Sequence, residues 1–239
     1  MNIFAAVAEW FLDPSQWSGP AGIPARLAEH LGYAALTLLI AAAVALPIGM
    51  YVGHTGKGRI AVVSVASALR ALPTLGLLTL FVIVMGLGLM PPILALVILT
   101  IPPLLAGAYS GIAAVDRTLV DAARAMGMTE WQVLAKVELP NALPVLLGGV
   151  RAAVLQVIAT VAVVAYINLG GLGRFLIDGL AVSDPVRMFG GAILIALLAL
   201  VVDGLLAVAQ KYAVSPGLAD RRHRQRRETP TVGAVQGGI

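Results

Sequence analysis

The sequence predicts an all-α membrane protein with five transmembrane helices. Of its 239 residues, 59% are hydrophobic and 12% are charged, whereas soluble domains carry about a quarter charged residues. Five apolar runs also reach the length of about 20 residues that is needed to cross a bilayer. These spans must be helical, because backbone polar groups in lipid need partners within the chain and so few spans cannot close a barrel.

The predicted spans follow one another along the chain, separated by more polar segments. Two of them contain no charged residue, and the other three contain one each. The predicted spans are Leu31–Val52, Ile60–Gly86, Pro92–Ile112, Leu143–Ile167 and Met188–Ala209.

Composition divides the chain into three parts. Residues 1–28 are expected to form an extracytoplasmic or interfacial segment, because Glu9 interrupts their apolar run and they lack the basic start of a signal peptide. Residues 29–212 form the predicted transmembrane domain. Residues 213–239 contain five arginines among prolines and glycines, which predicts a disordered basic tail.

The distribution of lysine and arginine predicts the orientation in the membrane. These residues accumulate in cytoplasmic segments, and here they are concentrated in residues 54–59, in residues 113–142 and after Gln210. We therefore expect a bacterial inner-membrane protein with its N-terminus outside and its C-terminus in the cytoplasm. The net charge of +4 reflects this topology, so lipid and not nucleic acid is the expected contact.

The sequence offers no recognisable catalytic or metal centre. It has no cysteine, and its histidines are scattered at His30, His54 and His223. It also lacks the His-Glu-x-x-His zinc motif and the phosphate-binding Gly-x-x-x-x-Gly-Lys-Ser/Thr loop of ATPases. We therefore expect neither a cofactor nor enzymatic activity, and an intramembrane enzyme is disfavoured.

The most informative segment is the predicted cytoplasmic loop of residues 113–142. Val120, Ala123, Met126 and Gly127 are spaced three and four residues apart, which places small and apolar groups on one helix face. Asp121 lies near the start of that helix, where the helix dipole favours negative charge. We expect a short helix that lies across the membrane surface and docks into a partner protein.

This loop resembles the EAA motif of ATP-binding-cassette importer permeases, in which glutamate-Ala-Ala is followed at fixed spacing by Gly and by Ile-x-Leu-Pro. The matching residues are Ala122, Ala123, Gly127, Leu139 and Pro140, with Asp121 in place of the glutamate and Val137 in place of the isoleucine. The resemblance implies the MetI-like (type-1) fold and coupling helices that sit in a groove of an ATPase. Pro140 is expected to end the helix pair before the next span.

The same resemblance implies a set of partners. They are two ATP-binding subunits, which bind the ATP, a second permease subunit in a homodimer or heterodimer, and a separate extracytoplasmic solute-binding protein. A channel or secondary transporter that works without an ATPase is the alternative from a different class.

Two other stretches, residues 71–77 and 166–175, resemble osmoprotectant permeases for glycine betaine, carnitine and choline. The resemblance implies that the transported solute is a compatible solute such as glycine betaine, choline, carnitine or proline betaine. Methionine-type permeases share the Gly-Gly-Leu-Gly sequence of residues 170–173, so an amino acid remains the alternative solute.

The candidates for the pathway or its gate lie near the outer end of the fourth span, together with Pro73, which is expected to bend the second span from inside it. Gly170, Gly171 and Gly173 are expected to use positive φ angles in a tight turn where the fourth span leaves the membrane. A tyrosine at a span end also suits the membrane interface. The candidates are Tyr166, Asn168, Gly170, Gly171, Gly173 and Pro73.

Three charged residues interrupt the apolar spans, where a charge costs about 2.5–3.5 kcal/mol on insertion scales. Arg151 lies near the cytoplasmic start of its span and is expected to extend its side chain to the interface. Arg70 and Asp203 are expected to pair with each other or with a partner subunit.

Overall fold

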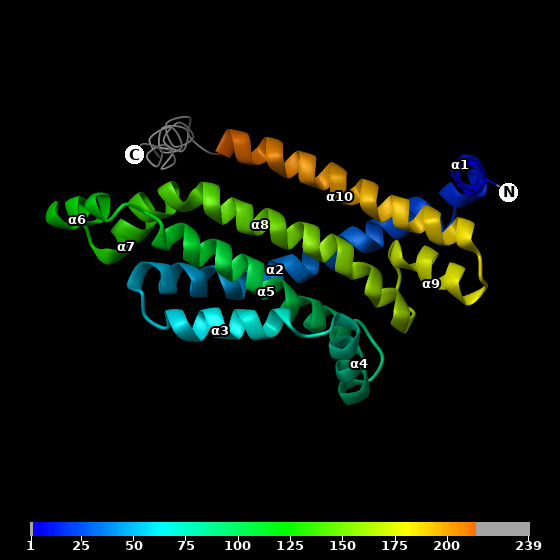
Figure 1. Ribbon diagram of the computed structural model, residues 1–239, viewed down its shortest axis with the longest axis horizontal. Helices are drawn as coiled ribbons and strands as arrows, with labels where there is room; N and C mark the ends of the chain where they lie inside the picture. The colour runs from blue at the N-terminus through cyan, green and yellow to red at the C-terminus, as the bar shows by residue number, and fades with distance from the viewer. Residues whose placement is uncertain (1, 214–239) are drawn as a thin grey trace, which may run out of the picture.

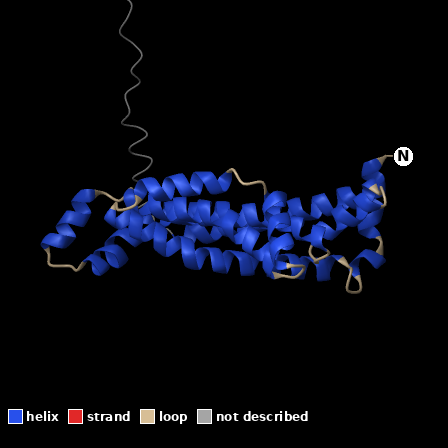
Figure 2. Cartoon of the chain, turned by 90° about the horizontal axis from the view of Figure 1, so that it is seen from below, coloured by secondary structure: helices blue, strands red, loops and turns tan. Residues whose placement is uncertain are grey.

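The computed structural model describes residues 2–213, and this part of the chain consists of helices joined by short loops (Figures 1 and 2). The predicted all-α fold is confirmed. In chain order the helices are α1 (Ile3–Leu12), the 3-10 helix η1 (Pro14–Trp17), α2 (Ile23–Thr55), α3 (Arg59–Arg70), α4 (Thr74–Met85), α5 (Met90–Ala113), α6 (Arg117–Ala125), α7 (Glu130–Val133), the π-helical turn η2 (Leu134–Glu138), α8 (Leu139–Val161), the 3-10 helix η3 (Ala162–Ile167), α9 (Gly173–Ala181) and α10 (Pro185–Ala213).

Four stretches of the described chain are long and apolar enough to cross a membrane. They are α2, α5, the continuous helical stretch Glu130–Ile167, and α10. The pair α3 and α4 also passes this test when taken together, so the described chain contains up to five spans. The predicted basic tail falls almost wholly on residues 214–239, which lie outside the described residues.

The second predicted span, Ile60–Gly86, is not one continuous helix. It is divided into α3 and α4, which are bent by 89° relative to each other, so that α4 turns away from the line of α3 (Figure 1). Pro73 explains the break, because proline has no N–H to donate and disfavours helical geometry at the preceding residue.

The centre of the bundle is α5, which packs between α2 and α8. The α2–α5 contact depends on two glycines four residues apart, Gly49 and Gly53. A Cβ atom at Gly49 would lie 2.7 Å from the Cβ of Ala108, and one at Gly53 would lie 2.7 Å from the Cβ of Ile112. Small residues at this spacing allow membrane helices to approach closely and gain van der Waals contact.

The α5–α8 contact uses glycine from both helices. A Cβ atom at Gly149 would lie 2.6 Å from the Cα of Gly107, and a Cβ at Gly107 would lie 2.6 Å from the Cα of Gly149. The two backbones therefore touch at this crossing, and neither position has room for a side chain.

The periphery is formed by α10, with α9 and the N-terminal helix α1 packed on it. Trp10 of α1 contacts Phe175 of α9 in an edge-to-face arrangement, with ring centroids 5.4 Å apart. Figure 1 places α1 and α9 at one end of the bundle and α6 and α7 at the other. The two candidate regions from the sequence therefore lie at opposite ends of the molecule.

Candidate functional site

The EAA-like loop folds as two short helices, α6 and α7, joined by a tight turn. Asp116 caps α6 by accepting a hydrogen bond from the backbone N–H of Thr118 at 2.9 Å. Thr129 and Gln132 form a reciprocal capping box that starts α7. Gly127 lies in the turn between them with φ +83°, a conformation that side chains disfavour.

The helix face predicted for docking is divided between the interior and the surface. Val120 and Ala123 are buried in an apolar cluster with Val133 and other residues of the same chain, so they are not available to a partner. Met126 is 76% exposed, and Gly127 has open space around its Cα. The prediction that Val120 and Ala123 belong to the docking face is therefore wrong, because these two side chains attach α6 to its own bundle.

The surface that remains open at this end combines apolar and acidic side chains. We call it the α6–α7 face, and it consists of Asp121, Ala122, Met126, Gly127 and Trp131, all exposed. Val137 and Leu139 of the motif are half-buried and pack on the apolar cluster below this face.

The sequence predicts that Pro140 ends the helix pair, and this prediction is wrong. The helix that begins at Glu130 continues through Leu139 and Pro140 into the membrane span. The π-helical turn Leu134–Glu138 lies just before the proline, and such turns relieve a break in the regular backbone hydrogen bonding. The second helix of the loop, α7, is thus continuous with α8.

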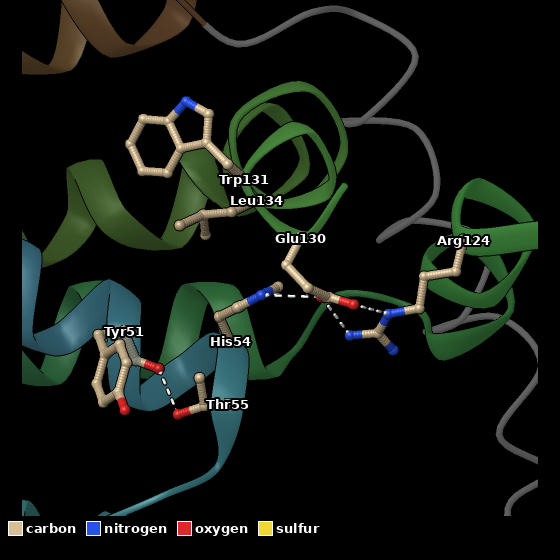
Figure 3. Close-up of a pocket in the computed structure, with 7 residues that line it drawn as sticks. All are labelled: Tyr51, His54, Thr55, Arg124, Glu130, Trp131 and Leu134. Atoms are coloured by element: carbon tan, nitrogen blue, oxygen red, sulfur yellow. Dashed lines mark hydrogen bonds and ion pairs between the residues drawn. The ribbon is translucent and has the colours of Figure 1, made fainter. Parts of the chain in front are cut away.

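A chain of polar side chains lies beneath the α6–α7 face, and the sequence analysis had treated its central member only as an isolated histidine. His54 from the last turn of α2 places Nδ1 2.6 Å from Oε2 of Glu138 and Nε2 3.1 Å from Oε2 of Glu130. Arg124 of α6 donates two hydrogen bonds to Glu130, from Nε at 3.0 Å and from Nη2 at 2.9 Å. Figure 3 shows Glu130 between His54 and Arg124.

The guanidinium of Arg124 also lies 3.6 Å from Asp121, which links the polar chain to the exposed face. The hydrogen bonds that Arg124 donates to Glu130 raise the pKa of Arg124 above its ordinary value, so the side chain stays cationic. A pocket of about 550 Å³ opens beside these residues. Its lining comes from α2, α6, α7 and η2 and consists of Tyr51, His54, Thr55, Arg124, Glu130, Trp131 and Leu134 (Figure 3).

The glycine-rich turn lies at the other end of the bundle, after η3. Only Gly171 among its glycines has a positive φ, of +89°, and Asn168 also adopts the left-handed conformation, with φ +64°. A Cβ at Gly170 would overlap the carboxylate of Glu29, and one at Gly173 would overlap the carbonyl of Ala162. The prediction of positive φ at all three glycines is therefore wrong for two of them, which are needed for close approach instead.

Polar contacts attach this turn to neighbouring helices. Glu29 of α2 accepts hydrogen bonds from the backbone N–H of Gly171 at 2.8 Å and from Arg26 at 3.0 Å. Asn168 accepts a hydrogen bond from Arg174 at 2.9 Å. The turn is thus held against the N-terminal end of α2 by charged side chains that were not among the predicted site residues.

The remaining candidate residues flank this region. Tyr166 is exposed, and Pro73 is the residue immediately before α4. A small cavity of about 10 Å³ is lined by Thr74 and Leu78 of α4 and by Val163 and Val164 of η3, together with residues of α5. The start of α4 and the segment before the glycine-rich turn therefore meet at one place.

The predicted pairing of Arg70 with Asp203 is wrong. Asp203 of α10 instead pairs with Arg151 of α8, which donates from Nε to one carboxylate oxygen and from Nη2 to the other at 2.6 Å. Arg70 is exposed at the end of α3 and has no carboxylate within ion-pair distance among residues 2–213. A bidentate contact of this kind satisfies both charges within one helix pair.

Comparison with known proteins assigns a family to this architecture. The family model described as "Binding-protein-dependent transport system inner membrane component" matches residues 45–212. The chain is 36% identical over 188 residues to the carnitine transport permease protein OpuCB of Listeria monocytogenes, which covers 79% of this chain and 86% of that protein. It is 31% identical over 193 residues to the glycine betaine/carnitine/choline transport system permease protein OpuCB of Bacillus subtilis (strain 168), covering 81% and 89%. A third relative is the osmoprotectant import permease protein OsmW of Salmonella typhimurium, 33% identical over 80% of this chain and 91% of that protein.

Two solved transporters share the fold. One is the MetNI methionine ABC transporter in inward facing conformations, with a TM-score of 0.70 and 21% identity over 78% of this chain and 94% of that one. The other is an amino acid ABC transporter with histidines, with a TM-score of 0.62 and 22% identity over 89% and 97%. At these identities the likeness concerns the fold alone.

Proposed function

Because this chain belongs to the binding-protein-dependent transport system inner membrane components, we propose that it carries a compatible solute, such as glycine betaine, choline, carnitine or proline betaine, into the cell. It is a permease subunit of an ATP-binding-cassette importer, a multi-pass protein of the inner membrane without catalytic function of its own. The predicted MetI-like fold is confirmed by the similarity to the methionine transporter.

The proposed solute class rests on the solutes named in the descriptions of the relatives. Proteins described as permeases for carnitine, choline, glycine betaine or osmoprotectants match about four-fifths of the chain at 31–36% identity. The methionine and amino acid transporters resemble it only at 21–22% identity. A small quaternary-ammonium solute is therefore the better supported cargo, and an amino acid is the alternative that the uptake experiment compares.

The α6–α7 face is the proposed contact for the ATPase subunit. It carries Asp121, Ala122 and Gly127 of the EAA-like motif on its exposed side, while the buried motif residues attach it to the bundle. Its continuous helical connection through the π-helical turn to α8 would allow a movement of this face to reach a membrane span. Movement of packed helices as units is how such couplings are transmitted.

The family implies ATPase and solute-binding partners in general. We further propose two ATP-binding subunits, a second permease subunit and an extracytoplasmic binding protein. The proposed topology places residues 1–28 outside, the transmembrane domain over residues 29–212 and residues 213–239 in the cytoplasm. Helix α1 lies at one end of the bundle, and α6 and α7 lie at the other (Figure 1). This separation supports the orientation, because lysine and arginine are concentrated in residues 113–142, which include α6 and α7, and these residue types accumulate on the cytoplasmic side.

The pathway or gate is proposed to involve the outer ends of α4 and η3. Tyr166 and Asn168 lie beside the glycine-rich turn of Gly170, Gly171 and Gly173. The helix that follows Pro73 shares a small cavity with η3. Gly173 lies close to the backbone of Ala162, and Gly171 uses a positive φ, so this turn depends on positions without a side chain.

Solute uptake by a strain that lacks its own osmoprotectant importers tests the solute class. The strain expresses this chain with its ATPase and binding protein, and radiolabelled glycine betaine, carnitine, choline and methionine are compared. We expect uptake of at least one quaternary-ammonium solute and no uptake of methionine. Uptake of methionine alone would overturn the proposed solute class.

Crosslinking tests the α6–α7 face, and the absence of cysteine in the chain makes single-cysteine variants simple to interpret. Met126→Cys is expected to crosslink to the ATPase subunit, because Met126 is exposed on this face. Ile60→Cys is the matched control, since Ile60 is exposed at the start of α3 and lies outside the face. Equal crosslinking from both positions, or none from Met126→Cys in an assembled complex, would contradict this contact.

A further inference from the structure

A chain of polar side chains, buried at Glu138 and nearly so at His54, connects the C-terminal end of α2 to both helices of the EAA-like loop. It runs from Glu138 in the π-helical turn through His54 of α2 and Glu130 of α7 to Arg124 of α6, and ends at exposed Asp121. We propose that His54 is a positioning residue that fixes the α6–α7 face relative to α2 and α8, so that ATP hydrolysis is coupled to solute movement. This inference rests on the proposed function of that face.

The inner end of this chain of polar side chains, formed by His54 and Glu138, is more deeply buried than an ion pair on the protein surface. The side chain of His54 is 10% exposed and that of Glu138 is 1% exposed. Oε2 of Glu138 contacts His54 Nδ1 at 2.6 Å, while Oε1 has no hydrogen-bond partner among the described residues. Because an unpaired buried carboxylate is costly, His54 is the group that allows Glu138 to be buried at this position.

The two ring nitrogens of His54 are used in different directions. One faces Glu138 in the π-helical turn, and the other faces Glu130 in α7. A neutral imidazole has a single N–H, so it donates to only one carboxylate. Both contacts are satisfied together when the ring carries two N–H groups or when one carboxyl group is protonated, and in either case His54 bridges two elements of the loop.

The outer end of this chain of polar side chains reaches the α6–α7 face, which is the proposed contact for the ATPase subunit. Arg124 holds Glu130 with two hydrogen bonds and lies 3.6 Å from Asp121. A partner that engages Asp121 competes for the guanidinium of Arg124, and the hydrogen bonds then carry the displacement through Glu130 to His54. The apolar cluster around Val120 is the second attachment of α6, and Met50 of α2 packs against it. That contact is apolar and carries no hydrogen bond, so the polar chain is the directional link between α6 and α2.

Two substitutions interrupt this chain of polar side chains and still leave Glu138 a hydrogen-bond donor. Glu130→Gln removes the carboxylate that joins His54 to Arg124, at a side chain that is 59% exposed. His54→Asn keeps a donor for Glu138, because the asparagine amide nitrogen takes the place of Nδ1, and it loses the contact that Nε2 makes with Glu130. Lys57→Gln is the matched control, because it removes a basic side chain three residues beyond His54 at an exposed position.

The experiment uses the whole complex in proteoliposomes, with its ATPase, its binding protein and the solute identified by the uptake assay. Solute moved and ATP hydrolysed are measured in the same sample. Glu130→Gln and His54→Asn are expected to assemble and to hydrolyse ATP, but to move at least about 5-fold less solute per ATP, the lower end of the usual coupling between sites. Lys57→Gln is expected to keep the wild-type ratio.

The amount of solute moved per ATP hydrolysed distinguishes a role in coupling from a purely structural role. A structural role lowers the amount of complex and leaves the solute moved per ATP unchanged, and that result for Glu130→Gln would overturn the inference. If His54→Asn does not assemble, Glu130→Gln alone decides, since the Glu130 side chain is 59% exposed. Failure of the proposed function is recognised separately, because the wild-type complex would then show no ATP-dependent uptake.

Discussion

The glycine contact between α5 and α8 gives a prediction with opposite outcomes at adjacent positions. A Cβ at Gly149 would lie 2.6 Å from the Cα of Gly107 and 3.0 Å from the carbonyl oxygen of Pro103, whereas a Cβ at Gly148 meets nothing within 4 Å. Carbon atoms pack at about 3.5–4.0 Å, so Gly149→Ala must move the two backbones apart by about 1 Å. Such overpacking costs about 1–3 kcal/mol.

Gly148→Ala is the matched control, because both substitutions add a methyl group within the same helix. The gain in helix propensity from glycine to alanine, about 0.8–1 kcal/mol, is common to the two variants and cancels in their difference. Gly149→Ala is therefore expected to be about 1–3 kcal/mol less stable than Gly148→Ala.

Denaturant unfolding of the purified chain in a mild detergent, followed by circular dichroism, measures this difference. The predicted result is a lower unfolding midpoint for Gly149→Ala and a midpoint at or above the wild-type value for Gly148→Ala. Equal midpoints, or a lower one for Gly148→Ala, would refute the inferred contact between the α5 and α8 backbones.

Three further predictions concern other contacts. Exchanging the charges of Arg151 and Asp203 in one double variant should restore the stability lost in either single reversal, because each single reversal places two like charges side by side. Combining Arg70→Asp with Asp203→Arg should not restore stability, and rescue by this second combination alone would favour the rejected pair. Gly173→Ala, which would overlap the carbonyl of Ala162, should lower the unfolding midpoint, whereas Gly32→Ala, with open space, should not; equal effects would argue against the close approach. Gly127→Asn should be more stable than Gly127→Val by about 1 kcal/mol in the same assay, because asparagine tolerates positive φ; a preference for valine would exclude the left-handed turn.

Hydropathy located the membrane-spanning helices because a span has a local signature. Long apolar runs identified α2, α5, α8 and α10 close to their observed positions. The bend between α3 and α4 was not predictable in size, since Pro73 marks where a helix is interrupted but not the angle of the next one. Neighbouring helices determine that angle, and here α4 packs on α5.

Contacts between distant residues were harder to predict than helices. His54 and Glu138 are 84 positions apart, and Arg151 and Asp203 are 52 apart. Which charge faces which depends on the rotation of each helix, and the spans of α8 and α10 bring Arg151 to Asp203 while α3 leaves Arg70 exposed. In the EAA-like loop, the spacing correctly grouped Val120 with Ala123, but it did not distinguish a helix face that packs inward from one that faces a partner.

The central claim is that this chain couples a solute pathway to a separate ATPase. Its most direct test is to measure whether solute movement requires ATP hydrolysis. Proteoliposomes containing this chain, its binding protein and its ATPase are compared with a matched sample in which the ATPase is catalytically inactive. The account predicts accumulation of a quaternary-ammonium solute only with ATP and the active ATPase. Equal solute flux with the inactive ATPase, or without ATP, would contradict it and would indicate a channel or a secondary transporter.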